Sequence, residues 1–164
     1  MKDYIPENDI KDSITKLVEY REEGYVFHGS TNPNLEKLVP NKAIDDGNPN
    51  DEFNNDTAIF ASSNPAASII FATVSFDNIP KEKWDKGWGI GGSINSIKAT
   101  IPIEYKEYIL NGKGFVYVLP KEGFADNGQS GSWEVKSKKE VTPIDKVEVE
   151  FTDFEKLGGR IEWV

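Results

Sequence analysis

The chain has 164 residues, of which 37% are hydrophobic and 12% aromatic, a composition typical of a globular protein. At about 150 residues per domain, we predict a single domain spanning residues 1–164. No apolar run approaches the roughly 20 residues that a membrane-spanning helix needs, so we expect no membrane association. The formal net charge of −9 repels polyphosphate, which argues against general nucleic-acid binding.

Cysteine is absent from the chain, and histidine occurs once, at His28. These counts exclude disulfides, thiolate nucleophiles and zinc sites that need sulfur or several imidazoles. Acidic residues cluster between positions 45 and 56, but the ligand order of a calcium-binding EF-hand is missing there. We therefore predict no metal site. A small anionic ligand held by backbone N–H groups remains compatible with the composition.

The N-terminal segment, residues 1–24, predicts an amphipathic helix over residues 8–23. Its apolar stripe follows the spacing i, i+4, i+7 and i+8, at Ile10, Ile14, Leu17 and Val18. Asn8 or Asp9 is a suitable N-cap, and Gly24 suits a left-handed C-terminal residue. Because the first residues mix charges and lack the apolar stretch of a secretory signal, we expect a cytoplasmic protein, with export by another route left open.

Two short apolar strands are predicted next, over residues 25–28 and 58–61, with a long polar surface loop over residues 41–57 between them. The second strand is followed by Ser62, Ser63 and Asn64 as cap residues and by Pro65, which suits a first helical turn. These residues introduce a small helix over residues 66–73. Its almost wholly apolar sequence, AASIIFAT, indicates packing on both sides.

The second half of the chain predicts mainly strands. We interpret the glycine-rich stretch 87–92 as a structural turn and residues 97–103 as a weakly alternating strand. A β-hairpin is expected between residues 105–110 and 115–119, because Asn111-Gly112 favours a tight turn. The last strands are predicted over residues 133–135 and 141–151. The fold class is therefore α+β, with an N-terminal helix and a small central helix.

His28 is the only side chain whose ordinary pKa lies near neutrality. It ends a predicted strand beside Gly29, where another backbone or a ligand can approach closely. Taken by itself, a single imidazole is more often a core or rim residue bonded to a carbonyl than a functional group. Neighbouring motifs are needed to assign it a function.

Three such motifs follow one another: HGST at residues 28–31, AIFASSNPAASIIFA at 58–72, and Glu134 within SWEVKSKKEVTP at 132–143. In this order they resemble the three signature regions of the ADP-ribosyltransferase superfamily, over residues 25–151. GFVYVLPKEGF, at 114–124, is similar to a strand and loop of the branch that modifies rifampicin. The resemblance implies a fold of split antiparallel β-sheets with NAD bound as a substrate in the cleft between them.

The resemblance also implies roles for individual residues. His28 would bond the adenosine ribose, Gly29 would meet the nicotinamide carboxamide through its backbone, and Ser30 would contact the nicotinamide ribose. Phe60 matches the end of the second-motif strand. Phe71 lies where many members carry a tyrosine that stacks on nicotinamide; it can stack without a hydroxyl, although core packing is the expected role.

For catalysis the resemblance points to Glu134, with Asp126 in the preceding loop as the second choice. A carboxylate beside the ribose stabilises the oxocarbenium-like charge that develops as nicotinamide leaves. A solvated surface glutamate is the alternative for Glu134. Another register places Ser132 at the catalytic position, where a serine provides no charge. In the Glu134 register, Ser132 is a neutral residue two positions upstream, which argues against an arginine acceptor.

These observations predict an enzyme that transfers ADP-ribose from NAD to an unknown protein or small-molecule acceptor, or that hydrolyses NAD slowly. The loop 41–57 is expected to border the pocket, and the loop 125–132 to face the acceptor. The alternative is an inactive binding or interaction module on the same fold, which the Ser132 register and the missing tyrosine favour. An RNA-directed transferase would need a basic groove, and the net charge argues against it.

Overall fold

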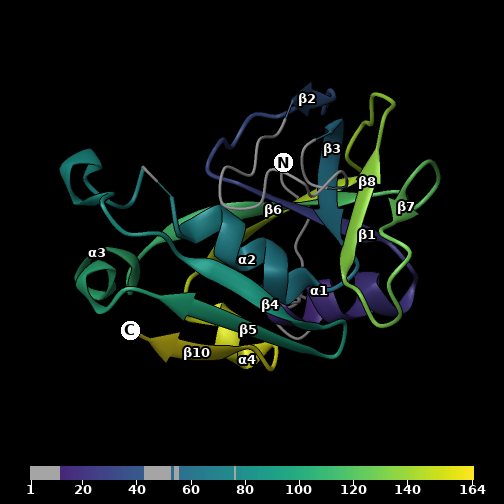
Figure 1. Ribbon diagram of the computed structural model, residues 1–164. Coiled ribbons are helices and arrows are strands. Elements are labelled where there is room, and N and C mark those ends of the chain that lie inside the picture. The colour runs from purple at the N-terminus through teal and green to yellow at the C-terminus, as the bar shows by residue number, and fades with distance from the viewer. Residues whose placement is uncertain (1–11, 43–52, 54–55, 76) are drawn as a thin grey trace, which may run out of the picture.

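The computed structural model describes residues 12–42, 53, 56–75 and 77–164. It is a small α+β fold in which two sheets enclose a central helix, so the α+β class predicted from the sequence is confirmed (Figure 1). The described α-helices are α1 (Ser13–Glu22), α2 (Pro65–Thr73), α3 (Lys106–Ile109) and α4 (Asp153–Lys156). Two short 3-10 turns are η2 (Lys81–Lys83) and η3 (Ile103–Tyr105). None of the described helices has the length and hydropathy needed to span a bilayer.

The larger sheet has the strand order β7-β8-β3-β1-β6-β9, with β2 paired to β3, and its named strand pairs are antiparallel. Its strands are β1 (Val26–Ser30), β2 (Asn41–Lys42), β3 (Thr57–Ser62), β6 (Lys113–Leu119), β7 (Ala125–Asp126), β8 (Glu134–Ser137) and β9 (Asp145–Glu150). The smaller sheet has the order β10-β5-β4, from β4 (Gly89–Ser93), β5 (Ser96–Ile101) and β10 (Arg160–Trp163). In it, β4 pairs antiparallel and β10 parallel with β5.

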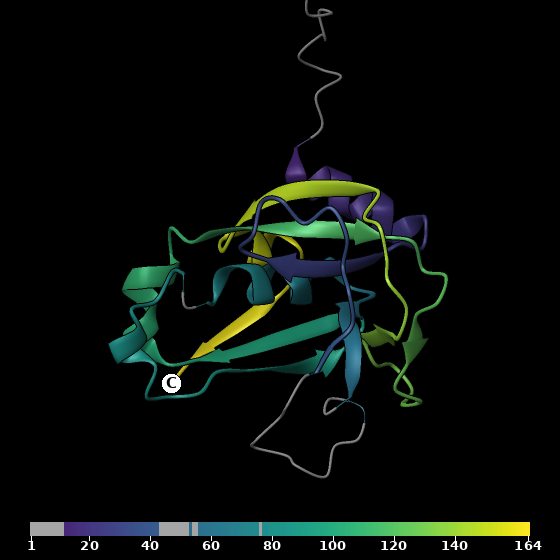
Figure 2. The same ribbon diagram turned by 90° about the horizontal axis from the view of Figure 1, so that it is seen from above.

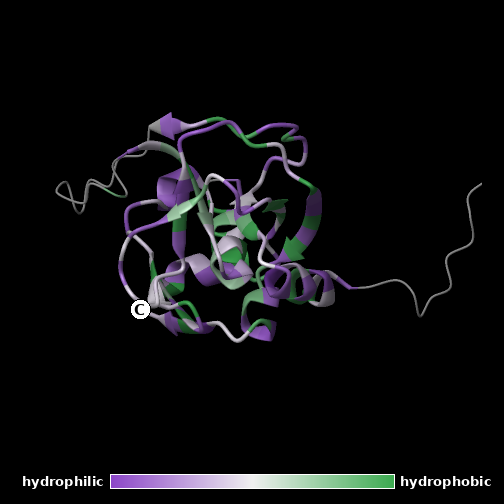
Figure 3. Cartoon of the chain, turned by 90° about the vertical axis from the view of Figure 1, so that its right-hand side faces the viewer, coloured by the Kyte–Doolittle hydropathy of each residue, from purple (hydrophilic) through white to green (hydrophobic). Residues whose placement is uncertain are grey.

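Helix α2 lies between the two sheets, as the view from above shows (Figure 2). Asn64 caps it by accepting a hydrogen bond from the backbone N–H of Ala66, and Pro65 occupies the first turn, as predicted. Every residue of α2 except Phe71 is buried, which confirms packing on both sides. Hydrophobic residues accordingly gather in the interior, and hydrophilic ones on the outer elements (Figure 3).

Two glycines on neighbouring strands allow this close packing. A Cβ atom added to Gly29 would lie 2.0 Å from the backbone oxygen of Ser68, and one on Gly114 would lie 2.2 Å from that of Ala72. Both contacts are far inside van der Waals distance and involve backbone, which cannot move aside easily. The glycine of the HGST sequence is therefore required for helix packing.

Helix α1 begins at Ser13, with Asp12 as its cap, and ends before Gly24, whose φ of +91° is the left-handed conformation predicted for it. The caps expected from the sequence, Asn8 and Asp9, lie outside the described residues. Most of the predicted loop 41–57 lies outside them as well. At its ends, residues 41–42 form β2 and Thr57 begins β3.

The predicted hairpin over residues 105–119 is wrong in its first arm. Residues 103–109 form η3 and α3, and only the second arm becomes a strand, β6. Tyr105 and Ile109 are both fully buried at the helical spacing i, i+4, and Pro102 precedes the turn as its cap. Burial of this apolar pair accounts for the helical conformation at positions where Asn111-Gly112 favoured a hairpin.

The glycine-rich stretch also differs from expectation. Residues 89–93 form strand β4, although the sequence predicted a turn over 87–92. The C-terminal helix α4 and strand β10 were not predicted either. Strand β10 pairs with β5, which precedes it by more than fifty residues, and such a long-range parallel pair has no local sequence signal.

Candidate functional site

A cavity of about 290 Å³ opens where two central strands separate. On one edge, β1 pairs with β6 at five successive residues; on the other edge, it pairs with β3 at Phe27 and Ser62 alone. The remaining residues of β1 and β3 are not in register with each other, and the cavity lies beside them. Its described lining is Phe27, His28, Gly29, Phe60, Ala61, Ser62, Ser68, Phe71, Trp133, Glu134 and Val135.

The imidazole of His28 bridges this gap between β1 and β3. Its Nδ1 lies 2.7 Å from the backbone oxygen of Phe60. Because a carbonyl oxygen can only accept, Nδ1 carries the proton, and Nε2 of the neutral ring is left as an acceptor. Burial lowers the pKa of His28 below its usual value of 6.5, and the bond to Phe60 opposes this shift only in part. The ring is therefore neutral at pH 7.

Glu134 begins β8 and faces the same cavity from the next strand. Its Oε2 accepts a hydrogen bond of 3.1 Å from Nδ2 of Asn127, and its backbone N–H donates to Oγ of Ser132 at 3.2 Å. The other carboxylate oxygen has no hydrogen bond to the described residues. Glu134 is also the one acidic residue in the described lining of the cavity. Its carboxylate is thus oriented by one amide and retains acceptor capacity.

Aromatic rings form the wall between α2 and β8. The ring of Phe71 lies 5.5 Å from Trp88 and 6.3 Å from Trp133, measured between centroids. Phe71 is 45% exposed, so the expectation that it packs in the core is wrong. Trp133 is buried but contributes to the cavity lining. Together these mutually inclined rings form an apolar wall next to a carboxylate.

Two further hollows share lining residues with the cavity. A hollow of about 250 Å³ shares His28 and Phe60 with it, and another of about 220 Å³ shares Trp133 and Glu134. The first is mainly apolar, lined by Leu35, Lys37, Leu38, Val39, Asn41, Ala58 and Ile59 besides the shared residues. The second is polar. Besides the shared Trp133 and Glu134, its described lining is Ile90, Gly91, Gly92, Ser93, Asn127, Gln129, Ser130, Gly131 and Ser132. The three hollows adjoin one another at these shared residues, and together they are called the depression below.

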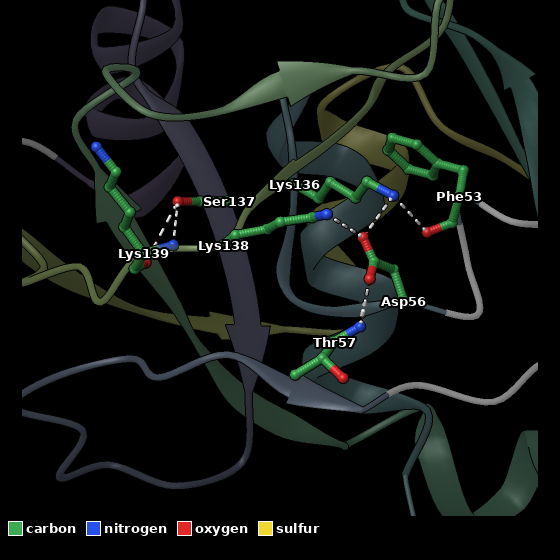
Figure 4. Close-up of polar contacts among 7 residues, drawn as sticks. All are labelled: Phe53, Asp56, Thr57, Lys136, Ser137, Lys138 and Lys139. Carbon is green, nitrogen blue, oxygen red and sulfur yellow. Dashed lines mark hydrogen bonds and ion pairs between the residues drawn. The ribbon is translucent and has the colours of Figure 1, made fainter.

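Lys136 lies two residues after Glu134, on the same face of β8. Its ammonium group lies 3.1 Å from Oδ2 of Asp56, donates to the backbone oxygen of Phe53 at 3.1 Å, and sits 4.3 Å from the centroid of the Phe53 ring (Figure 4). The hydrogen bond from Lys136 is the largest cause that lowers the pKa of Asp56. These contacts hold Phe53 edge-on against Phe60 at 6.1 Å, beside the cavity. The ammonium group of Lys136 is therefore already bonded to Asp56 and Phe53.

The structure brings together five of the residues that the sequence singled out: His28, Gly29, Phe60, Phe71 and Glu134 all line the cavity. The other three lie elsewhere. Ser30 accepts a hydrogen bond from the backbone N–H of Asn32. Asp126 accepts one from Gly128 in a turn. Ser132 lines the adjoining polar hollow.

Sequence reasoning missed Trp133, Asn127, Ser62 and Ser68 at this site. Trp133 is buried and lines the cavity. Its position directly before Glu134 was the available signal. Ser68 lines the cavity while its hydroxyl donates to the backbone oxygen of Phe27 at 2.9 Å, which no local pattern indicates.

The described residues contain no group of three or more acidic or histidine side chains that could hold a metal ion. In comparisons with known proteins, no family model, no curated protein and no solved structure matches the chain. The function must therefore be inferred from the cavity and its residues.

Proposed function

We propose that the chain binds NAD in this depression and transfers its ADP-ribose to an acceptor, or hydrolyses it slowly where no acceptor is present. One observation carries the proposal: His28 and Glu134, which the sequence resemblance selected from distant motifs, line the same cavity. The opening between β1 and β3, in a fold of two sheets, supports the split-sheet arrangement of the ADP-ribosyltransferases.

His28 has the chemistry needed to recognise a ribose. The bond to Phe60 fixes the ring and leaves Nε2 as an acceptor for a ribose hydroxyl. Burial keeps the ring neutral, so it accepts a hydrogen bond at pH 7 and adds no positive charge beside a developing cation. Because the bond to Phe60 already holds the ring, the imidazole needs little reorientation when the substrate binds.

Glu134 is the group that would promote bond cleavage. As the bond from ribose C1′ to the nicotinamide nitrogen breaks, its electron pair leaves with nicotinamide and positive charge develops on the ribose. A carboxylate held beside that carbon stabilises the charge more in the transition state than in the bound substrate. Asn127 is a positioning residue, because its amide fixes one carboxylate oxygen.

The three adjoining hollows together offer room for a dinucleotide. The central cavity of about 290 Å³ lies just below the range for small-molecule sites, roughly 300–1,000 Å³, and the adjoining hollows have about 250 and 220 Å³. The apolar hollow beyond His28 suits adenine, and Lys37 is the one cation in its described lining. The rings of Phe71 and Trp133 suit nicotinamide.

A binding module without enzymatic activity is the second candidate. The observation in its favour is that the described lining of the cavity has a single carboxylate, whereas Asp126 is engaged in a turn outside it. An apolar, aromatic cavity with few polar groups is also suited to binding alone. The two candidates differ in one measurable property, the release of nicotinamide.

Calorimetric titration with NAD and a nicotinamide-release assay on wild type and Glu134→Gln distinguish these candidates. For the enzyme, we expect wild type to bind NAD and release nicotinamide, and Glu134→Gln to release it on the order of 10²–10³-fold more slowly. The matched control is Asp126→Asn, which we expect to retain the wild-type rate. NAD binding without release, or no detectable NAD binding, favours the binding or interaction module, and absence of NAD binding contradicts the enzyme.

A further inference from the structure

Strand β4 contains two glycines that neither its backbone conformation nor its packing requires. A Cβ atom on Gly89 or Gly91 would meet nothing within 4 Å, and neither residue has a positive φ. By contrast, Gly29 and Gly114 are in contact with α2, and Gly92 has a φ of +96°. Glycine in the interior of a strand is unfavourable and often marks a place where another backbone approaches closely.

The strand that carries these glycines has an open edge. In the described part of the chain β4 pairs with β5 alone, at the margin of the smaller sheet (Figure 1). Alternate residues of a strand lie on the same face, so Gly89 and Gly91 share one face of β4. Ile90 lies on the opposite face and packs against the core. Such an edge presents unpaired N–H and C=O groups to an incoming extended chain.

This edge borders the polar hollow beside Glu134. Gly91, Gly92 and Ser93 line that hollow together with the loop 127–132, and the backbone N–H of Ile94 donates to the oxygen of Gly131 at 2.7 Å. Glu134 is the only ionisable side chain in its described lining. The hollow therefore joins an open strand edge to the carboxylate of the central cavity.

We propose that an extended peptide segment of an acceptor protein binds along β4 and presents a serine or threonine hydroxyl to the polar hollow. This inference rests on the proposed function and specifies its acceptor. The peptide backbone would pair with the open edge, and the glycines would admit it closely. The hydroxyl side chain would meet the amides and hydroxyls of Asn127, Gln129, Ser130 and Ser132.

The groups that line the hollow disfavour an acidic acceptor and can bond a hydroxyl. An acidic side chain would be repelled by Glu134, whereas the amides and hydroxyls of the lining can bond a serine or threonine hydroxyl. The neutral Ser132, two positions before Glu134, is the feature that the sequence resemblance takes as evidence against an arginine acceptor. In the transfer, a bond forms between the hydroxyl oxygen and ribose C1′ as the bond to nicotinamide breaks. The hydroxyl proton passes to the carboxylate of Glu134 and then to water, so the step needs no further reactant.

The test is to incubate the full chain with NAD and libraries of ten-residue peptides that have randomised flanks and a central Ser, Thr, Arg or Asp. Mass spectrometry detects attached ADP-ribose, and released nicotinamide is measured in parallel. We expect modification in the Ser and Thr libraries. We also expect Gly91→Phe, which fills the hollow, to lower the ratio of peptide modification to nicotinamide release at least tenfold. Gly87→Phe, at an equally open position outside the hollow, is the control and should keep the wild-type ratio.

Thermal melting of both variants shows whether they fold, which the open space at each position leads us to expect. Modification in the Arg or Asp libraries alone, or an unchanged ratio in Gly91→Phe, overturns the peptide proposal. Nicotinamide release without modification of any peptide overturns it as well and leaves the proposed function standing. Absence of both NAD binding and nicotinamide release contradicts the proposed function, and the acceptor proposal with it.

Discussion

The two edges of strand β1 differ in how their backbone groups are satisfied. Toward β6 the strand forms a ladder of five paired residues; toward β3 it has one pair, and the side chain of His28 bonds the carbonyl of Phe60. A buried carbonyl needs a partner, and here an imidazole supplies it in place of a backbone N–H. The comparison shows how an incomplete ladder in the middle of a sheet creates a cavity without leaving that carbonyl unpaired.

We call the edge of β1 toward β6 the closed edge and the edge toward β3 the open edge. Helix α2 stabilises the closed edge in addition to the ladder of paired residues. Gly29 and Gly114 let the helix approach both strands, and the buried face of α2 completes the core. On the open edge, rings and a carboxylate occupy the space that a ladder would fill. Substitutions on the two edges should therefore affect different properties: stability on the closed edge, and ligand chemistry on the open one.

The largest effect is expected on the closed edge. Gly114→Ala places a methyl group against the backbone of Ala72, and overpacking against a backbone should lower the free energy of unfolding by about 3 kcal/mol. Urea denaturation measures this change. Gly87→Ala is the control, since its Cβ meets open space, and should stay within about 0.5 kcal/mol of wild type. Equal midpoints for the two variants would contradict the packing account.

On the open edge, Asn127→Ala should alter turnover with little change in stability. Loss of the amide frees the carboxylate of Glu134, and we expect kcat for nicotinamide release to fall about tenfold, equivalent to about 1.4 kcal/mol. KM for NAD should change little, because Asn127 lies outside the central cavity. Gln129→Ala, in the same hollow, serves as the control. A raised KM with an unchanged kcat would show that Asn127 binds substrate and does not position Glu134.

A smaller effect concerns the pH dependence of stability. The pKa of His28 is lowered in the folded chain, so below pH 6.5 the unfolded chain binds a proton that the folded chain does not. Stability should therefore fall as pH drops below 6.5, by at most about 1.4 kcal/mol per pH unit for one proton. The difference in unfolding free energy between wild type and His28→Asn, measured by urea denaturation at pH 7.5 and 5.5, isolates the contribution of His28 to this pH dependence. A pH-independent difference would place His28 in a solvated environment.

Local sequence signals predicted the elements that hold the site. Pro65 with its preceding cap residues located the start of α2, and Gly24 marked the end of α1. The motif order selected His28 and Glu134, which the fold brings to one cavity. The start of α2 and the end of α1 are confirmed because capping and turn residues act on their immediate neighbours.

Other features depend on contacts that the sequence does not reveal. Asp126 was a candidate because of its loop, but its carboxylate accepts a bond within its own turn. Trp133 and Asn127 reach the site only because β8 pairs with β3 and the loop before it folds back. The gap beside β1 depends on a side chain that replaces a ladder bond, and strand propensity contains no information about such a replacement.

The most direct test of the central claim is a calorimetric titration of NAD into wild type and His28→Asn. The amide nitrogen of asparagine can occupy the place of Nδ1 and donate to the carbonyl of Phe60, so the fold should be retained while the acceptor Nε2 is removed. We predict NAD binding at least about tenfold weaker in the variant, with a melting temperature close to that of wild type. Equal NAD affinity in the two proteins would show that the imidazole in the gap between β1 and β3 does not bind the substrate.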